Sequence, residues 1–341
     1  MLEVDIQGIR GNSSALFQFR ALPGITAIVG PSGAGKTSLL RALAGLDVPT
    51  SGRISLNETP LTGAPEMRDI GMVFQEPRLL PHLNIRSNIE LGRQSIVSID
   101  QLAHDLGINA LLDRMPHGLS GGEKQRVMIA RALFGSPKLM LFDEPLSAID
   151  PRLKTDLIAL VRQHFADAKI PVLYVTHQMD EAAQLANELI AIDAGQIVAQ
   201  GPIAETMAKL DGAAFFENGI TSVLNGRVAA IDKRFDLAQI AIGEQLVDLP
   251  ARNMAVGEEV RLRVWARDVL LAKERLVGVS ARNQLLGAVE TISMTDQAHA
   301  DILVRVEGSL VRARVMCKTV SDMEMAVNQP IFVVFKSASV E

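Results

Sequence analysis

The chain has 341 residues, a net charge of −5 and 21% charged residues. This length exceeds what one ordinary hydrophobic core organises and indicates two or three domains. The composition is that of a soluble globular protein: no apolar run reaches the ~20 residues of a membrane-spanning helix, and neither half has the basic excess of a nucleic-acid binder.

The N-terminus and the cysteine content indicate the compartment. Residues Met1–Asp5 lack the basic start of a signal peptide, so we expect the protein to stay in the cytoplasm. The single cysteine, Cys317, allows no intramolecular disulfide and fits a reducing environment. We expect it to be a small, half-buried structural residue.

The first elements are predicted to be strands followed by a helix. Residues 2–9 and 16–20 alternate apolar and polar, with Gly11-Asn12 between them, as in an antiparallel pair of strands. The apolar run 24–29 predicts a buried strand, and residues 38–44 predict a helix. Between them, residues 30–37 read G-P-S-G-A-G-K-T and match the P-loop pattern, which binds phosphate between a strand and a helix.

The residue types of this loop suit a polyphosphate. Glycines 30, 33 and 35 permit positive φ and let backbone N–H groups converge on phosphate oxygens. Lys36 is expected to reach the β- and γ-phosphates and Thr37 to hold Mg²⁺, while the helix dipole favours the negative charge. A plain glycine-rich turn is the alternative, and both flanking elements argue against it. The candidate nucleotide-binding residues are Gly30, Pro31, Ser32, Gly33, Ala34, Gly35, Lys36, Thr37 and Ser38.

Two further polar positions follow predicted strands. After a turn and a short strand at 53–57, residues 69–74 read as a strand that ends at Gln75. The carboxyl edge of an open α/β sheet is where ligands bind, although most glutamines there are simply solvated. The buried strand 170–176 ends at His177, which is placed to contact a γ-phosphate if it is not merely structural.

Residues 84–135 are predicted to be helical, with breaks at Pro116 and Gly118. Ser120 and Glu123 form a capping box that starts the last of these helices. The capping box does not explain Gly121 and Gly122, because each glycine in a helix costs ~1 kcal/mol relative to alanine. Glycines beside a serine at an exposed helix start suit the close approach of an anion.

A continuous apolar run at 138–142 is typical of a parallel strand covered on both faces, and it ends in Asp143 and Glu144. Asp143 is expected to hold Mg²⁺, whereas Glu144 points elsewhere and is expected to polarise an attacking water. A plain turn before Pro145 is the alternative.

With these motifs in this order, residues 1–219 resemble the ATP-binding subunit of an ABC transporter. The resemblance makes residues 30–37 the Walker A motif, Gln75 the Q-loop residue, 119–125 the signature, 139–144 the Walker B motif and His177 the switch histidine. Residues 147–150 occupy the D-loop, with Ile149 in place of the usual leucine.

The resemblance implies an α/β P-loop NTPase (ABC ATPase) fold with a helical subdomain, ATP as substrate and a functional dimer. It implies catalysis by Glu144, His177 and Gln75, and Mg²⁺ held by Thr37, Gln75 and Asp143. The family dimerises head to tail, so that Ser120, Gly121 and Gly122 of the signature act on nucleotide bound at the partner's loop, and Asp150 of the D-loop is a further candidate nucleotide-binding residue. The family also stacks adenine on an aromatic residue near the N-terminus, for which Phe17 is the candidate.

The second half, residues 220–341, predicts an all-β, OB-like domain. Its pattern changes to short strands separated by turns, at 226–231, 238–242, 260–264, 287–289 and 302–306. A dimerisation or spacer domain would show the same pattern.

Residues 278–341 resemble the small molybdate-binding (Mop) domain that ends the ATPase subunits of molybdate importers. The likeness is carried by residues 280–283, which read S-A-R-N, and by the ending 335–340. Hydroxyl, amide and cationic groups suit a tetrahedral dianion such as molybdate or tungstate. The candidate anion-binding residues are Ser280, Arg282, Asn283, Lys318 and Lys336.

These resemblances predict the ATP-hydrolysing subunit of a molybdate importer. It would be a homodimer docked beneath two membrane permease subunits at the cytoplasmic face of the inner membrane, supplied by a substrate-binding protein. The alternatives are import of tungstate, sulfate or another small solute, such as a sugar or a polyamine. An ABC ATPase of DNA repair or translation is disfavoured, because the chain has no long coiled-coil insertion, second cassette or basic surface, and we expect no nucleic-acid partner.

Overall fold

The computed structural model describes residues 1–9, 11–92, 98–135, 137–166, 169–210, 215, 219–251, 254–336 and 338–340. Ser337, within the motif at 335–340, lies outside this set. The chain divides into two compact units, Met1–Gly201 and Pro202–Glu341, each with its own sheet structure.

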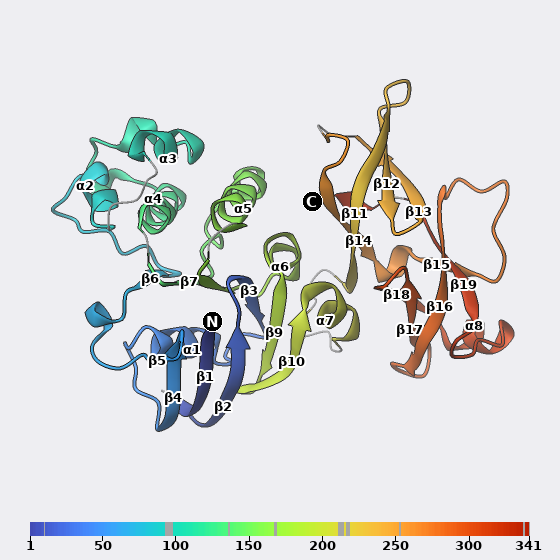
Figure 1. Cartoon of the computed structure of the whole chain (residues 1–341), viewed down its shortest axis with the longest axis horizontal. Coiled ribbons are helices and arrows are strands. Elements are labelled where there is room, and N and C mark those ends of the chain that lie inside the picture. The colour runs from blue at the N-terminus through green and yellow to red at the C-terminus, as the bar shows by residue number, and fades with distance from the viewer. Residues whose placement is uncertain are drawn as a thin grey trace. The chain divides into compact units, whose positions relative to one another are not determined.

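The first unit is built on a ten-stranded sheet of order β5-β4-β1-β2-β10-β9-β3-β8-β7-β6. Strands β1, β2, β4 and β5 are antiparallel, whereas β3 and β6 to β9 are parallel. Parallel strands end at one edge, so the loops after β3, β6, β7 and β8 meet there (Figure 1). The strands are β1 (Leu2–Ile9), β2 (Asn12–Ala21), β3 (Gly24–Val29), β4 (Ser51–Leu56), β5 (Thr59–Pro60), β6 (Ile70–Val73), β7 (Leu139–Asp143), β8 (Pro171–Val175), β9 (Glu188–Asp193) and β10 (Gln196–Pro202).

The helices of this unit confirm the predicted α/β fold with a helical subdomain. Helix α4 packs against α2 and α3, and the three lie together beyond β6 and β7 (Figure 1). The stretch predicted as helical from 84 to 135 is thus divided into short pieces. The helices are α1 (Lys36–Leu43), α2 (Ile85–Glu90), α3 (Ile99–Asp105), α4 (Gly121–Phe134), α5 (Pro151–Ala166) and α6 (Met179–Leu185), with 3-10 turns at Pro65–Met67, Asn109–Leu111 and Pro116–Gly118.

The core of the first unit holds α1 firmly. Leucines 39, 40 and 43 of α1 are fully buried among side chains from both the antiparallel and the parallel strands. Phe17 on β2 belongs to this core with an exposed fraction of 0%. The expectation that Phe17 stacks on adenine is therefore wrong, because its ring is packed inside the unit beneath Gly35.

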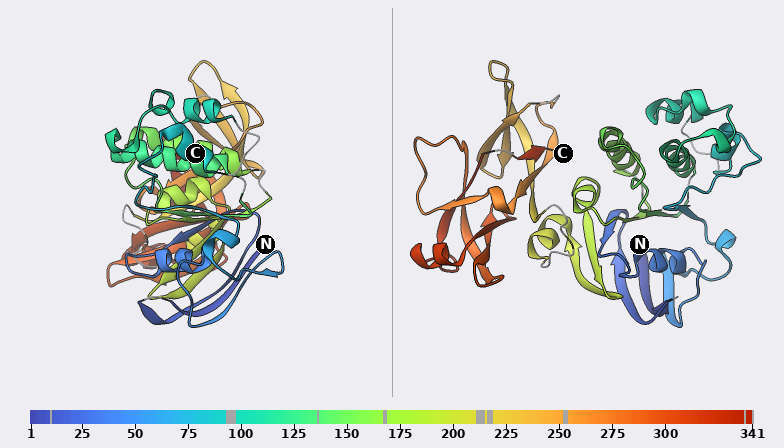
Figure 2. Two further views of the ribbon diagram at one scale, coloured as in Figure 1. Left: turned by 90° about the vertical axis from the view of Figure 1, so that its left-hand side faces the viewer. Right: turned by 180° about the vertical axis from the view of Figure 1, so that it is seen from behind.

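The second unit consists of two antiparallel five-stranded sheets that share one apolar core, which confirms the predicted all-β region (Figure 2). Their strand orders are β13-β12-β11-β14-β20 and β15-β19-β16-β17-β18. The strands are β11 (Thr221–Asp232), β12 (Leu237–Ile242), β13 (Gln245–Pro250), β14 (Glu259–Trp265), β15 (Leu270–Ala272), β16 (Asn283–Met294), β17 (His299–Val306), β18 (Ser309–Met316), β19 (Pro330–Phe335) and β20 (Ser339–Val340), with a 3-10 turn at Ala266–Asp268.

Two short helices accompany these sheets, α7 (Ile203–Lys209) and α8 (Cys317–Asp322). Helix α7 packs against β11 and β18, and the buried guanidinium of Arg312 on β18 donates from Nε to the carbonyl of Ala208 at 2.8 Å. The helix therefore belongs to the second unit, although the sequence-based division after residue 219 assigned it to the first. Among the described helices, none combines the length and apolarity needed to cross a bilayer.

Candidate nucleotide-binding site

The P-loop follows the buried strand β3 and depends on its glycines. A Cβ on Gly30 would lie 2.1 Å from the carbonyl oxygen of Ile192, so only glycine fits there. Gly35 is the N-cap of α1 in the left-handed region, with φ of 101°, and no described side chain caps the helix. A helix start of this kind offers backbone N–H groups to an anion.

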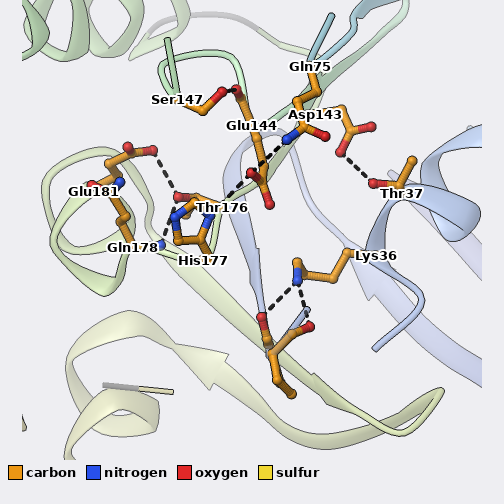
Figure 3. A network of polar contacts seen from close by, with 12 residues as sticks. Lys36, Thr37, Gln75, Asp143, Glu144, Ser147, Thr176, His177, Gln178 and Glu181 are labelled. Carbon is orange, nitrogen blue, oxygen red and sulfur yellow. Dashed lines mark hydrogen bonds and ion pairs between the residues drawn. The ribbon is translucent and has the colours of Figure 1, made fainter. Parts of the chain in front are cut away.

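Lys36 lies across the inside of the loop. Its ammonium is buried and donates to the carbonyls of Gly30 at 2.7 Å and Pro31 at 2.9 Å (Figure 3). Burial lowers the pKa of Lys36 below its usual range, against the opposing effect of the nearby carboxylates. The cation is thus held at the loop by carbonyl groups that a phosphate can replace.

Thr37 and Asp143 bring hard oxygen ligands together. The Thr37 hydroxyl donates to Asp143 Oδ1 at 2.9 Å, joining the start of α1 to the end of β7. Asp143 has an exposed fraction of only 3%, and this burial raises the pKa of its carboxyl, opposed by the hydrogen bond from Thr37. A hydroxyl and a carboxylate are ligands that Mg²⁺ prefers, so the pair fits this ion.

Glu144 is the point where three loops meet. Its Oε2 accepts from Gln75 Nε2 at 3.3 Å and lies 3.2 Å from Nδ1 of His177 (Figure 3). The residue has φ of 46°, and the Ser147 hydroxyl donates to its carbonyl at 3.0 Å, so the turn after β7 is fixed. The sheet edge therefore brings together Gln75, Glu144 and His177, with the Thr37 and Asp143 pair bonded separately.

The signature segment starts α4 with the predicted capping box. Ser120 accepts from the Glu123 backbone N–H at 3.3 Å, and the Glu123 carboxylate accepts from both the backbone and the hydroxyl of Ser120, which lowers the pKa of Glu123. A Cβ on Gly122 would lie 3.3 Å from the carbonyl oxygen of Ala148, whereas one on Gly121 would meet no atom of the described part of the chain within 4 Å. Packing against residues 147–150 therefore partly explains why position 122 is glycine. It does not explain why position 121 is glycine.

Asp150 is exposed and immediately precedes α5. Its backbone carbonyl accepts from the N–H groups of Leu153 and Lys154, at 3.0 and 3.1 Å. The end of the 147–150 segment is therefore continuous with the first turn of α5.

The candidate anion residues of the second unit are only partly together. Arg282 and Asn283 both face Asp248 of β13: the guanidinium donates to Asp248 Oδ2 at 3.1 and 2.7 Å, and the buried Asn283 amide bonds the Asp248 backbone at 2.8 and 3.2 Å. Ser280 is exposed just before them, and Lys336 follows Phe335, which pairs with Asn283. Lys318 lies in α8, which follows β18 next to the opposite end of β16.

Comparisons with known proteins cover both units. The family model described as ABC transporter matches residues 22–147, and the one described as TOBE domain matches residues 279–341. The molybdenum import ATP-binding protein ModC of Rhizobium johnstonii is 36% identical over 95% of this chain and 94% of its own. ModC of Methylococcus capsulatus is 38% identical over 93% of this chain and 92% of its own.

The chain belongs to the ModC family.

Comparison with solved structures supports the ABC ATPase fold. An ATP-binding cassette, solved as a post-hydrolysis dimer with ADP and Pi, is 25% identical with a TM-score of 0.51, over 60% of this chain and 99% of its own. A bacterial Atm1-family ABC exporter with ATP bound is 28% identical with a TM-score of 0.53, over 63% of this chain and 41% of its own.

Two polar residues of this ModC family member are buried beside the site, and the sequence analysis named only the first of them, as the last residue of the signature. Gln125 is buried in α4, and its Nε2 donates to the carbonyl of Phe74 at 3.3 Å, which joins the signature helix to the residue before Gln75. Glu181 in α6 is buried and accepts from the hydroxyls of Tyr174 and Thr176. Tyr174 in β8 and Thr176 directly after the strand are two residues apart, and this spacing was the only signal for a shared buried partner.

Proposed function

We infer that the protein is the ATP-hydrolysing subunit of an ABC importer of molybdate. The observation that carries this inference is the similarity to ModC proteins along nearly the whole chain. The site geometry supports it, because Lys36, Thr37, Asp143 and Glu144 converge at one sheet edge as ATP hydrolysis requires.

In the proposed mechanism the P-loop binds the polyphosphate of ATP. The backbone N–H groups of residues 30–38, other than Pro31, would surround the phosphates, and Lys36 would exchange the carbonyls of Gly30 and Pro31 for β- and γ-phosphate oxygens. Thr37, Asp143 and Gln75 would hold Mg²⁺, which when bound neutralises charge on the phosphates.

Glu144 is the proposed general base. Its carboxylate accepts a hydrogen bond from the attacking water and so orients and polarises it. Gln75 and His177 both contact this carboxylate, and the imidazole of His177 is proposed to contact the γ-phosphate as well. Phosphoryl transfer depends mainly on positioning of this kind.

The functional unit is a homodimer in which Ser120, Gly121, Gly122 and Asp150 of each subunit complete the partner's site. The open start of α4 at Gly121 supports this role, since among the described residues no atom lies within 4 Å of a Cβ built on that glycine. We propose that dimer closure on ATP drives two membrane permease subunits at the cytoplasmic face of the inner membrane, and that a substrate-binding protein delivers the anion to them.

The second unit is proposed to bind molybdate or tungstate as a regulator. Ser280, Arg282 and Lys336 supply a hydroxyl and two cations at one end of β16, with Asn283 beside them, and Lys318 would have to come from elsewhere in the dimer. Accumulated anion would then slow transport.

The substitution Glu144→Gln tests the proposed function. It keeps the shape of the side chain and removes the base, so ATP hydrolysis should fall by about 10²-fold or more while ATP still binds. An ATP-bound dimer should then accumulate in sedimentation experiments. A Glu144→Gln variant that stays monomeric at saturating ATP contradicts the sandwich mechanism, and wild-type chain that hydrolyses no ATP contradicts the function itself.

A further inference from the structure

The contacts of the His177 side chain do not by themselves fix its position. Its side chain is 32% exposed and is paired with Glu144 in the loop between β8 and α6. Helix α6 has seven residues, which is too short to be stable without anchoring. The position of the imidazole therefore depends on what fixes the neighbouring backbone.

Thr176 fixes that backbone on one side of His177. Its N–H donates to the carbonyl of Ile28 on β3 at 3.1 Å, just before the P-loop. Its hydroxyl oxygen accepts from the N–H of Gln178 at 3.0 Å, so a hydrogen bond closes around His177 (Figure 3). The same hydroxyl donates to Glu181 at 2.9 Å, and its orientation is thus set by that carboxylate.

Glu181 is the centre of a buried polar network. Its Oε2 accepts from Thr176 and from the Tyr174 hydroxyl at 3.0 Å, and its Oε1 pairs with the ammonium of Lys154. The side chains of Glu181 and Lys154 are only 5% and 16% exposed. A buried ion pair contributes little net stability compared with apolar packing, so its retention beneath the site needs another reason.

Lys154 connects this network to the 147–150 segment. Its ammonium also donates to Gln178 Oε1 at 2.7 Å, which holds the residue after His177. Its backbone N–H donates to the carbonyl of Asp150 at 3.1 Å. One residue of α5 therefore links the segment proposed to act on the partner's site with the loop that carries His177.

We propose that Glu181 and Lys154 are positioning residues, which hold His177 against Glu144 through Thr176 and Gln178. Neither residue touches the reacting atoms. Loss of the pair would remove the carboxylate that orients the Thr176 hydroxyl and the ammonium that holds Gln178, and the imidazole would lose its fixed place beside the base. This inference rests on the proposed ATPase function.

The test compares Glu181→Gln with a matched control in the full-length protein. We expect Glu181→Gln to lower kcat about tenfold, with KM for ATP within about twofold, since P-loop contacts are untouched and a small misplacement of a catalytic group is costly. Glu290→Gln removes a carboxylate paired with Arg305 in the second unit and should leave kcat unchanged. Lys154→Met changes the other, more exposed partner of the ion pair and should lower kcat in the same way.

A spectroscopic measurement separates positioning from a merely structural effect. The chain has six histidines, and the imidazole resonance of His177 is identified by its loss in the spectrum of His177→Ala. Glu181→Gln and Lys154→Met should each move the His177 resonance and leave the other five in place, whereas Glu290→Gln should leave that of His177 unmoved. Wild-type kcat in both variants, or reduced kcat with an unmoved His177 resonance, overturns the proposal. An inactive wild-type chain would instead contradict the ATPase function on which it rests.

Discussion

The Asp143 carboxylate serves Mg²⁺ binding in the proposed mechanism, but its buried charge lowers the free energy of unfolding of the nucleotide-free protein. Burial raises its pKa, so between the ordinary value of 3.8 and the raised value the folded state binds more protons than the unfolded state. Stability contributed by this group therefore falls as pH rises through that window. We expect Asp143→Asn to raise the unfolding free energy of the nucleotide-free protein at neutral pH, by about 0.5–2 kcal/mol.

Denaturant titrations over a pH series measure this effect. The advantage of Asp143→Asn over wild type should shrink as the pH falls toward 3.8, where Asp143 becomes protonated in both states. Mg²⁺-dependent hydrolysis should be lost in the same variant, because a charged ligand is gone. If the difference in unfolding free energy between Asp143→Asn and wild type stayed constant across the pH series, burial of the charge would not be its cause.

Lys36 is the cation that the P-loop itself provides. Lys36→Ala should abolish productive ATP binding, because no other cation in residues 30–38 replaces its contact with the phosphates. Binding of a fluorescent ATP analogue measures this directly. Unchanged ATP turnover would refute the assignment of this loop.

Most residues of the site could be identified from the sequence, because each follows a strand whose carboxyl end lies at the same sheet edge. The convergence of Gln75 and His177 on Glu144 is a consequence of this topology. Phe17 was misjudged because alternation along β2 shows that a face is buried without showing how deeply. Glu181 was missed because its partners lie on other elements, and only packing brings them together.

At the level of elements, the two glycines at the start of α4, Gly121 and Gly122, are needed for different reasons. Gly121 has free space beside it in its own chain, so Gly121→Ala removes the flexibility of glycine without a clash and should raise the unfolding free energy by up to about 1 kcal/mol. The same substitution should weaken the ATP-dependent dimer, since the added methyl group faces the partner's nucleotide in the proposed sandwich.

Gly122→Ala is the matched comparison. Its methyl group would lie 3.3 Å from the carbonyl oxygen of Ala148, so it should gain less stability than Gly121→Ala or lose some. Thermal unfolding and ATP-dependent sedimentation of both variants provide the measurement. If Gly121→Ala left dimerisation intact, the signature would not act on the partner's site through this position.

Elements with continuous apolar runs were predicted within a few residues, as for β3 at Gly24–Val29 and β7 at Leu139–Asp143. Strand β18 escaped prediction although it is long and buried. Arg312 interrupts its apolar pattern, and burial of that side chain is possible because its guanidinium pairs with Asp301 on β17 at 3.2 Å and donates to the carbonyl of Ala208 at 2.8 Å. The sequence alone does not show this pairing, because it depends on the register between β17 and β18.

At the level of the whole molecule, the second unit is the part proposed to make the ATPase respond to an anion. Its fold class followed from the spacing of strands and turns, but its proposed anion site came only through resemblance. Asn283 is buried with its amide bonded to the backbone of Asp248, so it contributes to the closure of the two sheets whether or not an anion binds. Of the candidate residues at that end of β16 that the structure describes, Ser280, Arg282 and Lys336 are exposed.

We predict that the full-length protein binds molybdate and tungstate more tightly than sulfate, with discrimination by the size of the site because charge and shape are shared. Arg282 is 70% exposed, but its guanidinium donates twice to Asp248, which competes with any anion for it. Arg282→Ala should therefore weaken molybdate binding, and Asp248→Asn should strengthen it by releasing the guanidinium from a charged partner. Titration calorimetry measures both, with Lys233→Ala as a surface-charge control that should leave the affinity unchanged. If folded, dimeric protein gives no heat with millimolar molybdate or tungstate, the second unit is a structural clamp, and the Arg282 and Asp248 pair serves only to join β16 to β13.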